Sequence, residues 1–354
     1  MPSAAARRAL PPDPPAGQAR LTAQLLAGPA AHDPVSVAQR LLAIQGQDPR
    51  GARLAIRART SGVSAADVDR ALSEERTLLI TWLNRGTLHL VASQDYAWLH
   101  ALTAPTLLTG NARRLAQEGV TPAAGDRGTE VIERSLAREG PLTRSQLRER
   151  LSQAGVRTEG QALGHLLMLA CLRGLAVRGP RVGRQHAYAL VRDWLGATKP
   201  VPRDRALAEL ARRYLAGHGP ADDRDLAKWA GLPLRDARSA LAAIASELIT
   251  RGDGLLDLAS RPRVAAVPPP RLLGAFEPVL LGWCSREPLL GADAPLIVTG
   301  GWFRPFALVA GRAAAVWSLS DGEVVIRPLR SLSDREAVAL REDAQLVTRF
   351  LADR

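Results

Sequence analysis

Apolar residues recur at helical spacing through the start of the chain. They form two stripes, one at Leu21, Leu25 and Leu26 and one at Val37, Leu41, Leu42 and Ile44. Spacings of three and four residues place such side chains on one face of a helix, and Ser36 is a suitable N-cap for the second. Asp48-Pro49-Arg50-Gly51 predicts the end of that helix, because proline restricts its predecessor and glycine frees the turn.

A third helix and a hairpin follow in the same stretch. Helical spacing returns over 65–73, and strand-like runs cover 77–83 and 87–91. Asn84-Arg85-Gly86 joins the two runs and is the kind of short turn that connects antiparallel strands. Three helices and a hairpin are the order of a winged helix, a helix-turn-helix variant that docks on DNA.

The same order of elements recurs twice downstream. The second copy has expected helices from Glu130, after Thr143 and over 160–172, with strands at 175–177 and 186–190. The third has expected helices over 205–216, 223–230 and 234–248, with short strands near 255–258. Gly140-Pro141 and Leu147 match Gly219-Pro220 and Leu226 at a constant offset of 79 residues. This internal repeat predicts three tandem winged-helix modules, of which the first is the most divergent.

The last quarter of the chain has a different pattern. Prolines at 262, 268, 269 and 270 predict a stiff, extended linker over 261–271. Beyond it, strand-like runs separated by glycines cover 272–281, 296–299, 306–309, 314–319 and 323–326. An amphipathic helix over 333–351 ends the chain, and Ser333 and Glu336 have the spacing of a capping box.

The predicted fold class is therefore mainly α with β wings, in which three tandem winged-helix modules precede a β-rich domain. The expected segments are a disordered tail (1–18), three winged-helix modules (19–110, 111–198 and 199–260), a proline-rich linker (261–271) and a β-rich domain with a C-terminal helix (272–354).

Composition limits the compartment and the chemistry. The 354 residues are 46% apolar, enough for several cores. The central apolar run 166–172 is far shorter than the ~20 residues that cross a bilayer, and no signal-peptide core follows Arg7 and Arg8. Cys171 and Cys284 lie far apart, and the six histidines lack the spacing of a metal site. We therefore expect a cytoplasmic, nucleoid-associated protein that contacts no membrane and needs no metal or other cofactor.

Charge favours a polyanionic partner. The net charge is +12, and nearly all of the positive charge is arginine. A GC-rich genome produces the same skew, so the local pattern matters more. Five arginines crowd one acid-poor stretch beside the first helix-turn-helix: Arg40, Arg50, Arg53, Arg57 and Arg59. At helical spacing they could follow a phosphate backbone or form a solvated face, and their position favours DNA contact.

Gln45-Gly46-Gln47 stands where the chain turns after the second apolar stripe. As a bare motif it carries no chemistry, since glutamines at a helix end are usually caps or surface residues. Paired carboxylates such as Glu74-Glu75 are explained by helix ends, and no Ser/His/Asp set is present, so hydrolases of those classes have no support.

The motifs together resemble the AlkZ-type winged-helix DNA glycosylases. The resemblance rests on 42–50 around the two glutamines, the hairpin 82–91, and Gly300 to Pro305 with Val316-Trp317. It runs from about residue 19 to the end of the chain. In that family three winged helices and a β-rich segment form a C-shaped clamp, and a Gln-x-Gln or Gln-x-Asp motif excises N7-alkylated guanine, including interstrand crosslinks. The usual aliphatic middle position is Gly46 here, which would loosen the loop.

The resemblance assigns Gln45 and Gln47 as catalytic residues of a monofunctional, monomeric glycosylase whose partner is double-stranded DNA carrying alkylated guanine. The residues expected to contact DNA are Arg50, Arg53, Arg57, Asn84, Arg85, His89, Trp302 and Arg304. His89 alternates with Leu88 and Leu90, so it is expected to face away from the apolar side. Trp283 and Trp317 are expected in the core.

Two readings of the hairpin around Arg85 stay open at this point. It is either the element that touches the lesion or an ordinary wing whose arginine meets a phosphate, and the loop at Gly300 to Pro305 is another candidate for the first role. The alternative for the whole chain is a winged-helix DNA-binding protein without catalysis, such as a transcription regulator. A regulator that reads a palindrome usually dimerises, whereas three different modules in one chain suit a clamp on a single lesion.

Overall fold

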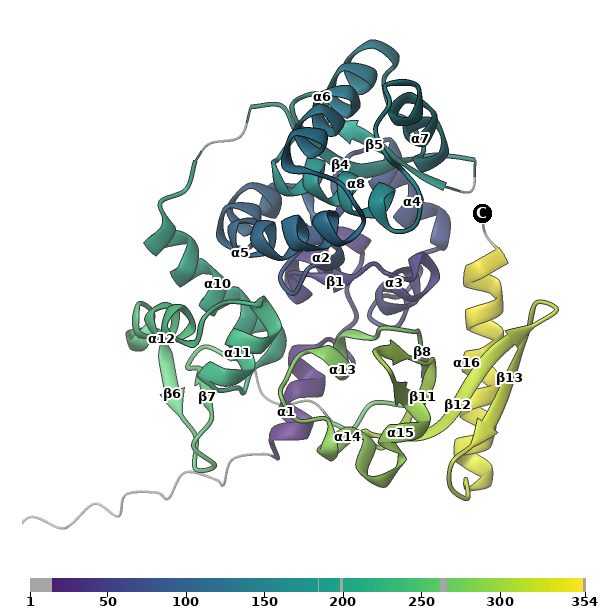
Figure 1. Cartoon of the computed structure of the whole chain (residues 1–354). Helices are drawn as coiled ribbons and strands as arrows, with labels where there is room; N and C mark the ends of the chain where they lie inside the picture. The colour runs from purple at the N-terminus through teal and green to yellow at the C-terminus, as the bar shows by residue number, and fades with distance from the viewer. Residues whose placement is uncertain (1–14, 184, 198–199, 262–265, 353–354) are drawn as a thin grey trace, which may run out of the picture.

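A computed structural model describes residues 15–183, 185–197, 200–261 and 266–352. Helices surround a central sheet, and a second sheet with a long helix forms the C-terminal part (Figure 1). The predicted tail lies largely outside the described residues, but α1 (Ala16–Ala23) already begins at Ala16, and Ala19 is fully buried.

The first segment contains three further short helices: α2 (Pro34–Leu41), α3 (Pro49–Arg57) and α4 (Ala65–Ser73). The helix predicted over 65–73 is confirmed, and a capping box between Ser64 and Asp67 starts it. The stretch Asp48 to Gly51, which was expected to end a helix, starts α3 instead. Asp48 caps α3 by accepting from the Arg50 backbone N–H, and Pro49 occupies the first helical position, where its missing N–H costs nothing.

The central sheet joins hairpins from two predicted modules. Its strand order is β1-β3-β2-β4-β5, with bounds β1 (Ile44–Gln45), β2 (Leu78–Leu83), β3 (Thr87–Ala92), β4 (Ala176–Val182) and β5 (Gln185–Leu190). Both hairpins were predicted, but not that they pair, which they do at Ile80 opposite Arg178. The short strand β1, opposite Leu90 and His89, extends the sheet at the start of Gln45-Gly46-Gln47.

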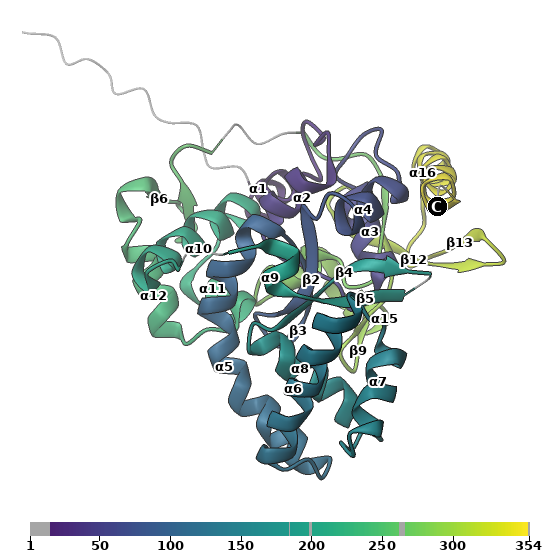
Figure 2. The same ribbon diagram turned by 90° about the horizontal axis from the view of Figure 1, so that it is seen from above.

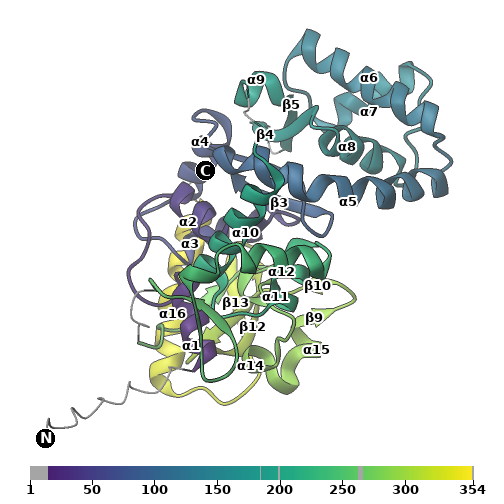
Figure 3. The ribbon, with the colours of Figure 1, turned by 90° about the vertical axis from the view of Figure 1, so that its left-hand side faces the viewer.

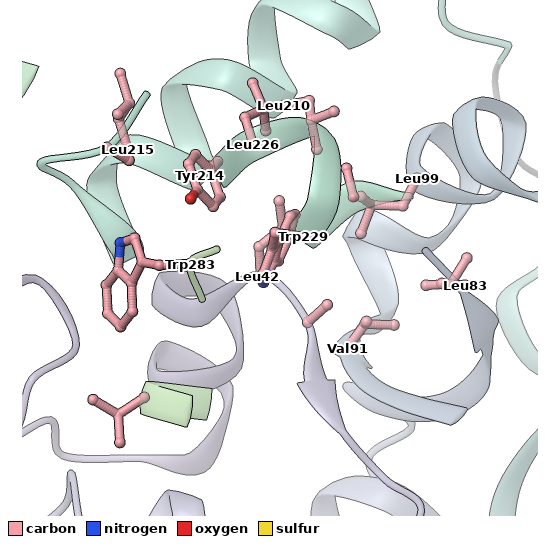
Figure 4. Close-up of a cluster of buried hydrophobic side chains, with 14 of the residues drawn as sticks. Leu42, Leu83, Val91, Leu99, Leu210, Tyr214, Leu215, Leu226, Trp229 and Trp283 are labelled. Carbon is pink, nitrogen blue, oxygen red and sulfur yellow. The ribbon is translucent and has the colours of Figure 1, made fainter. Parts of the chain in front are cut away.

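Both faces of this sheet are buried, because side chains alternate between the faces of a strand. On one face, Ile80 and Leu90 pack with α2, α3 and α4. On the other face, Leu83 and Val91 join a large cluster with Leu99. This cluster also contains residues between 206 and 244, which belong to the third segment described below, as Figure 4 shows. The first segment therefore packs between two other parts of the chain.

The second segment has a core of its own. After a 3-10 turn at Ser93–Asp95 come α5 (Tyr96–Gln117), α6 (Pro122–Glu139), α7 (Arg144–Gln153), α8 (Ala162–Leu172) and, past β5, α9 (Val191–Leu195). The long helix α5 was not predicted, and it continues through Pro105. Figures 2 and 3 show this segment projecting from the body of the molecule, on the same side as the loop between β9 and β10 of the C-terminal part.

The third segment repeats details of the second. It contains α10 (Arg203–His218), α11 (Asp223–Ala230), α12 (Leu234–Ala242), a 3-10 turn (Ala245–Glu247), β6 (Leu248–Thr250) and β7 (Leu256–Leu258). The helix expected over 234–248 ends earlier, at Ala242. At the predicted offset, Thr143 and Asp222 both form capping boxes, and Leu142 and Ala221 both bridge to a strand. The sequence repeat is therefore also a repeat of local structure.

The C-terminal part is less regular than predicted. Its four-stranded sheet has the order β13-β12-β11-β8, from β8 (Arg271–Leu273), β11 (Phe306–Val309), β12 (Arg312–Ser320) and β13 (Glu323–Pro328). Short helical turns replace most of the strands expected over 272–281 and 296–299: α13 (Pro278–Leu281), α14 (Glu287–Leu290), a 3-10 turn (Gly291–Asp293) and α15 (Ala294–Ile297). A two-stranded hairpin, β9 (Val298–Thr299) and β10 (Trp302–Phe303), follows. The terminal helix α16 (Asp334–Ala352) is confirmed.

Buried arginines fasten the first segment to the C-terminal part. Arg59 and Glu277 are both fully buried, and the guanidinium lies 2.5 Å from the carboxylate. The same guanidinium donates to the backbone carbonyl and the side-chain oxygen of Gln24. Nearby, Gly51 approaches Ala275 so closely that a Cβ would lie 2.3 Å from the Ala275 carbonyl oxygen. This interface leaves no room for a side chain at Gly51 and keeps the buried Arg59 paired.

We expect Glu277→Gln to lower the free energy of unfolding by about 3 kcal/mol or more, because it leaves the buried Arg59 charge without its counter-ion. Urea denaturation measures the change. Glu75→Gln is the control, since it removes a partner from the half-exposed Arg70 and should cost less than about 1 kcal/mol. Equal losses for the two variants would contradict a special role for the buried pair.

Candidate active site

Gln45 is held in the short strand β1. Its Cα lies opposite that of His89 in β3, and only 6% of its surface is exposed. Because opposed residues of antiparallel strands point to the same face, Gln45 shares a sheet face with His89 and Thr81. Its side chain therefore lies between the sheet and the third segment, fixed by the strand and not by a loop.

Gly46 and Gln47 continue the attachment to β3. The Gly46 N–H donates to the Leu88 carbonyl at 2.6 Å, and the Gln47 Oε1 accepts from the Leu88 N–H at 3.4 Å. Unlike Gln45, Gln47 is exposed. The two glutamines thus present one amide at the interior and one at the surface, with β3 between Leu88 and His89 as their common support.

The glycine between them is buried and does not loosen the motif. A Cβ at Gly46 would lie 3.5 Å from both Ile80 Cγ2 and the Leu90 backbone nitrogen, which is ordinary van der Waals contact. The position therefore faces the apolar cluster around α2 to α4, as an aliphatic side chain would. The backbone bond from Gly46 to Leu88 holds the segment without such a side chain.

The tip of the β2–β3 hairpin does not project from the molecule. Asn84 is fully buried with φ at 53°, and its carbonyl oxygen would lie 2.5 Å from a Cβ on Gly231. Gly231 ends α11 in the left-handed conformation that favours glycine, so the tip docks on the end of that helix. The expectation that Asn84 contacts DNA from an exposed wing is wrong for this structure, because the third segment covers it.

Arg85 lies at this tip and contacts Gln45. Its Nη1 donates to the Trp229 carbonyl at 2.6 Å, and its Nη2 donates to Gln45 Oε1 at 3.4 Å. Burial, with a smaller contribution from the positive charge of Arg286, lowers the pKa of Arg85 to about 10, so the guanidinium remains charged at neutral pH. A cation thus lies directly against one of the two glutamines.

His89 is buried, contrary to the expectation that it faces away from the apolar side. The alternation was read correctly, but both faces of the sheet are covered. Its Nδ1 lies 2.9 Å from the Thr87 carbonyl oxygen. Burial and, to a smaller extent, the charge of Arg85 lower the pKa of His89 to about 3, so it is neutral at physiological pH and cannot act as a cationic DNA contact.

The predicted arginine patch separates into different environments. Arg50 is exposed at the start of α3, as a DNA contact requires. Arg53 forms an ion pair with Asp69 and also donates to the Pro49 carbonyl. Arg57 is buried, holds both oxygens of Asp343 at 2.9 Å and donates to the Leu272 carbonyl. Because its guanidinium is buried against Asp343 of α16, Arg57 is a core residue and not a phosphate contact.

The β9–β10 hairpin carries the exposed aromatic surface. Trp302 is 70% exposed, and Arg304 is also exposed. Phe303 packs against Phe276, and the guanidinium of Arg286 lies 5.1 Å from the Phe303 ring centroid. Trp283 and Trp317 are buried, as expected. Arg286 was missed in the sequence, where a single arginine beside Cys284 and Ser285 gives no signal.

Two negative findings apply to the described part of the chain. It contains no group of three or more His, Cys, Asp or Glu side chains arranged to hold a metal ion. Nor does any of its helices have the length and apolar character needed to span a membrane.

Comparison with known proteins agrees with this geometry. A family model described as DNA glycosylase AlkZ-like matches residues 38–350. A curated relative from Streptomyces sahachiroi, the interstrand DNA cross-link repair glycosylase, is 28% identical over 346 residues, which cover 91% of each protein. The solved structure of the Streptomyces sahachiroi DNA glycosylase AlkZ matches with a TM-score of 0.79 at 26% identity, over 95% of both chains.

The family model covers Gln45-Gly46-Gln47, the central sheet, the helices from α3 to α15 and most of α16, so the match extends over nearly the whole chain. On this ground the chain belongs to the AlkZ-like family of DNA glycosylases, which hydrolyse glycosyl bonds.

Proposed function

We propose that this DNA glycosylase hydrolyses the N-glycosidic bond of N7-alkylguanine in double-stranded DNA, including bulky adducts and interstrand crosslinks. The observation that carries the proposal is the attachment of Gln45-Gly46-Gln47 to β3, which fixes the buried amide of Gln45 and the exposed amide of Gln47 beside the same strand. The relative named for interstrand cross-link repair supports the crosslink part. Self-resistance or general repair of alkylated DNA would both use this reaction.

The substrate class follows from what two amides can do. Alkylation at N7 makes guanine a cationic leaving group, so no strong acid is needed to protonate it. What remains is to hold a water molecule and to stabilise the oxocarbenium-like sugar. The carbonyl oxygens of Gln45 and Gln47 supply dipoles for both tasks, and an amide is too weak a base for an unactivated purine.

A crosslinked guanine is tied to both strands and cannot be turned out into a closed pocket. We therefore place the DNA in an open cleft of a C-shaped clamp, which three winged-helix modules of a single protein molecule form. The exposed Trp302 and Arg304 are the side chains proposed to meet the lesion, in place of the fully buried Asn84. Trp302 offers a stacking face, and Arg304 a charge for phosphate.

Replacing Gln45 and Gln47 together by Ala should abolish release of 7-methylguanine. Duplex affinity should stay within a few-fold, since neutral amides add little to the phosphate-driven binding term. Single-turnover base release and a binding titration on the same purified protein give the two values. Excision at the wild-type rate would remove both glutamines from the mechanism.

The exposed arginines should account for part of the salt dependence. Arg50→Ala and Arg304→Ala should each lower the slope of log K against log salt by up to ~0.9. Arg57→Met is the control: it should leave the slope unchanged and lower the midpoint of thermal unfolding, because it breaks the buried bond to Asp343. A slope that changes only with Arg57 would reverse this assignment.

Trp302→Ala should impair the unhooking of a crosslink more than the release of 7-methylguanine, because only the crosslink requires the groove to be widened at the lesion. Single-turnover rates on both substrates measure the ratio. Leu346→Ala, a truncation of another exposed apolar residue, on α16, should leave the ratio unchanged. Equal losses on the two substrates for Trp302→Ala would show that the hairpin serves general DNA binding.

A further inference from the structure

Arg85 is a cation with only neutral hydrogen-bond partners. It donates to the Trp229 carbonyl and to Gln45 Oε1, and no carboxylate of the described residues forms an ion pair with it. Arg59, in contrast, is fully buried and has Glu277 as its counter-ion. A largely buried guanidinium without a counter-ion is costly, so the fold keeps Arg85 at the motif at the expense of stability.

Arg286 is a second cation with neutral partners, and it is half-buried beside the β9–β10 hairpin. It precedes α14, donates from Nε to the Leu280 carbonyl at 2.6 Å, and lies over the Phe303 ring. Among the residues that the structure describes, it too forms no ion pair with a carboxylate. Burial lowers the pKa of both arginines, and the charge of Arg286 contributes further to the lowering at Arg85. Arg85 thus lies against Gln45, Arg286 lies against Phe303 of the β9–β10 hairpin, and neither has a carboxylate partner among the described residues.

An anion is needed to explain this arrangement in a glycosylase. The reaction builds positive charge on the sugar, and an unneutralised Arg85 beside Gln45 would oppose that charge. DNA itself carries the remedy, since the sugar under attack has a phosphodiester on each side. A guanidinium presents a planar fork of donors that matches two phosphate oxygens. It binds a charged phosphate more strongly than it binds a neutral carbonyl.

We propose that Arg85 and Arg286 bind a backbone phosphate beside the lesion, and that this binding releases the carbonyl of Gln45 for the attacking water. This inference rests on the proposed function. Arg85 is in this view a positioning residue that acts through Gln45, and Arg286 continues the phosphate contact toward the hairpin of Trp302.

The hydrogen bond to Gln45 is suited to such an exchange. At 3.4 Å it is long for a bond from a charged donor, while the bond to Trp229 is short at 2.6 Å. Trp229 can therefore hold the side chain in place while the second nitrogen changes partner from amide to phosphate. Without DNA the Gln45 oxygen is occupied; with DNA bound it is free, so hydrolysis is coupled to correct placement of the strand.

The test removes the charge from the DNA and not only from the protein. Duplexes carry one 7-methylguanine and a neutral methylphosphonate at each flanking phosphate in turn. Wild-type protein should lose at least about tenfold in single-turnover rate at one of these positions, as expected for loss of a charge-assisted contact. A wild-type enzyme that is indifferent to every flanking substitution would overturn the proposal without any variant being made.

The variants then assign the contact. Arg85→Ala should be slow on normal DNA and insensitive to the methylphosphonate, and Arg85→Lys should restore affinity more than rate, since an ammonium lacks the fork. Arg286→Ala should weaken affinity with a smaller effect on rate. Arg341→Ala on α16 removes an exposed charge elsewhere and should keep full methylphosphonate sensitivity. An Arg85→Ala protein that retains wild-type rate or sensitivity contradicts the inference.

Failure of the proposed function would look different. If wild-type protein binds the lesion duplex with a salt slope that falls by ~0.9 in Arg85→Ala, yet releases no 7-methylguanine, the phosphate contact stands and the substrate assignment fails. If it releases the base with an Arg85-independent slope and rate, the substrate assignment stands and the phosphate contact fails.

Discussion

Burial of charge is the constraint around which this molecule is arranged. An arginine taken out of water requires a carboxylate or several carbonyls at fixed positions, and the chain supplies them from distant segments. Arg59 is satisfied by Glu277 and Gln24, and Arg57 by Asp343. These bonds hold the C-terminal part against α3, the helix that starts directly after Gln45-Gly46-Gln47, so they help to fix the position of that motif as well.

The motif itself gains its rigidity from strand pairing. Gln45 and Gln47 come from a segment of low intrinsic structure, yet β1 adds to the edge of a sheet whose two faces are buried. The backbone of β3 therefore determines where both amides lie, and the neutral His89 opposite Gln45 adds no competing acid or base. The sheet thus fixes a weakly reactive pair of side chains, which would suit the proposed reaction because its leaving group is already activated.

Local signals in the sequence predicted local structure well. The helix start at Thr143, the capping box at Ser333, the hairpin turn before Thr87 and the 79-residue repeat all correspond to features of the fold, because each depends on local sequence. The errors concern partners far away. Arg57 looked like a surface cation because Asp343 lies 286 residues downstream, and Asn84 looked like a wing tip because Gly231 was not known to cover it. Two-sided burial of the sheet likewise reversed the reading of His89.

The bond between Arg57 and Asp343 also has a consequence for biosynthesis. The first segment leaves the ribosome before α16 is synthesised. At that stage Arg57 lies in an incomplete core, because its counter-ion Asp343 is not yet part of the chain. The second segment has a hydrophobic cluster whose buried residues all come from that segment. The core around Arg57 instead depends on contacts between distant parts of the chain, which raise the contact order, and a chain that stops before α16 would expose an unfinished core to proteases and chaperones.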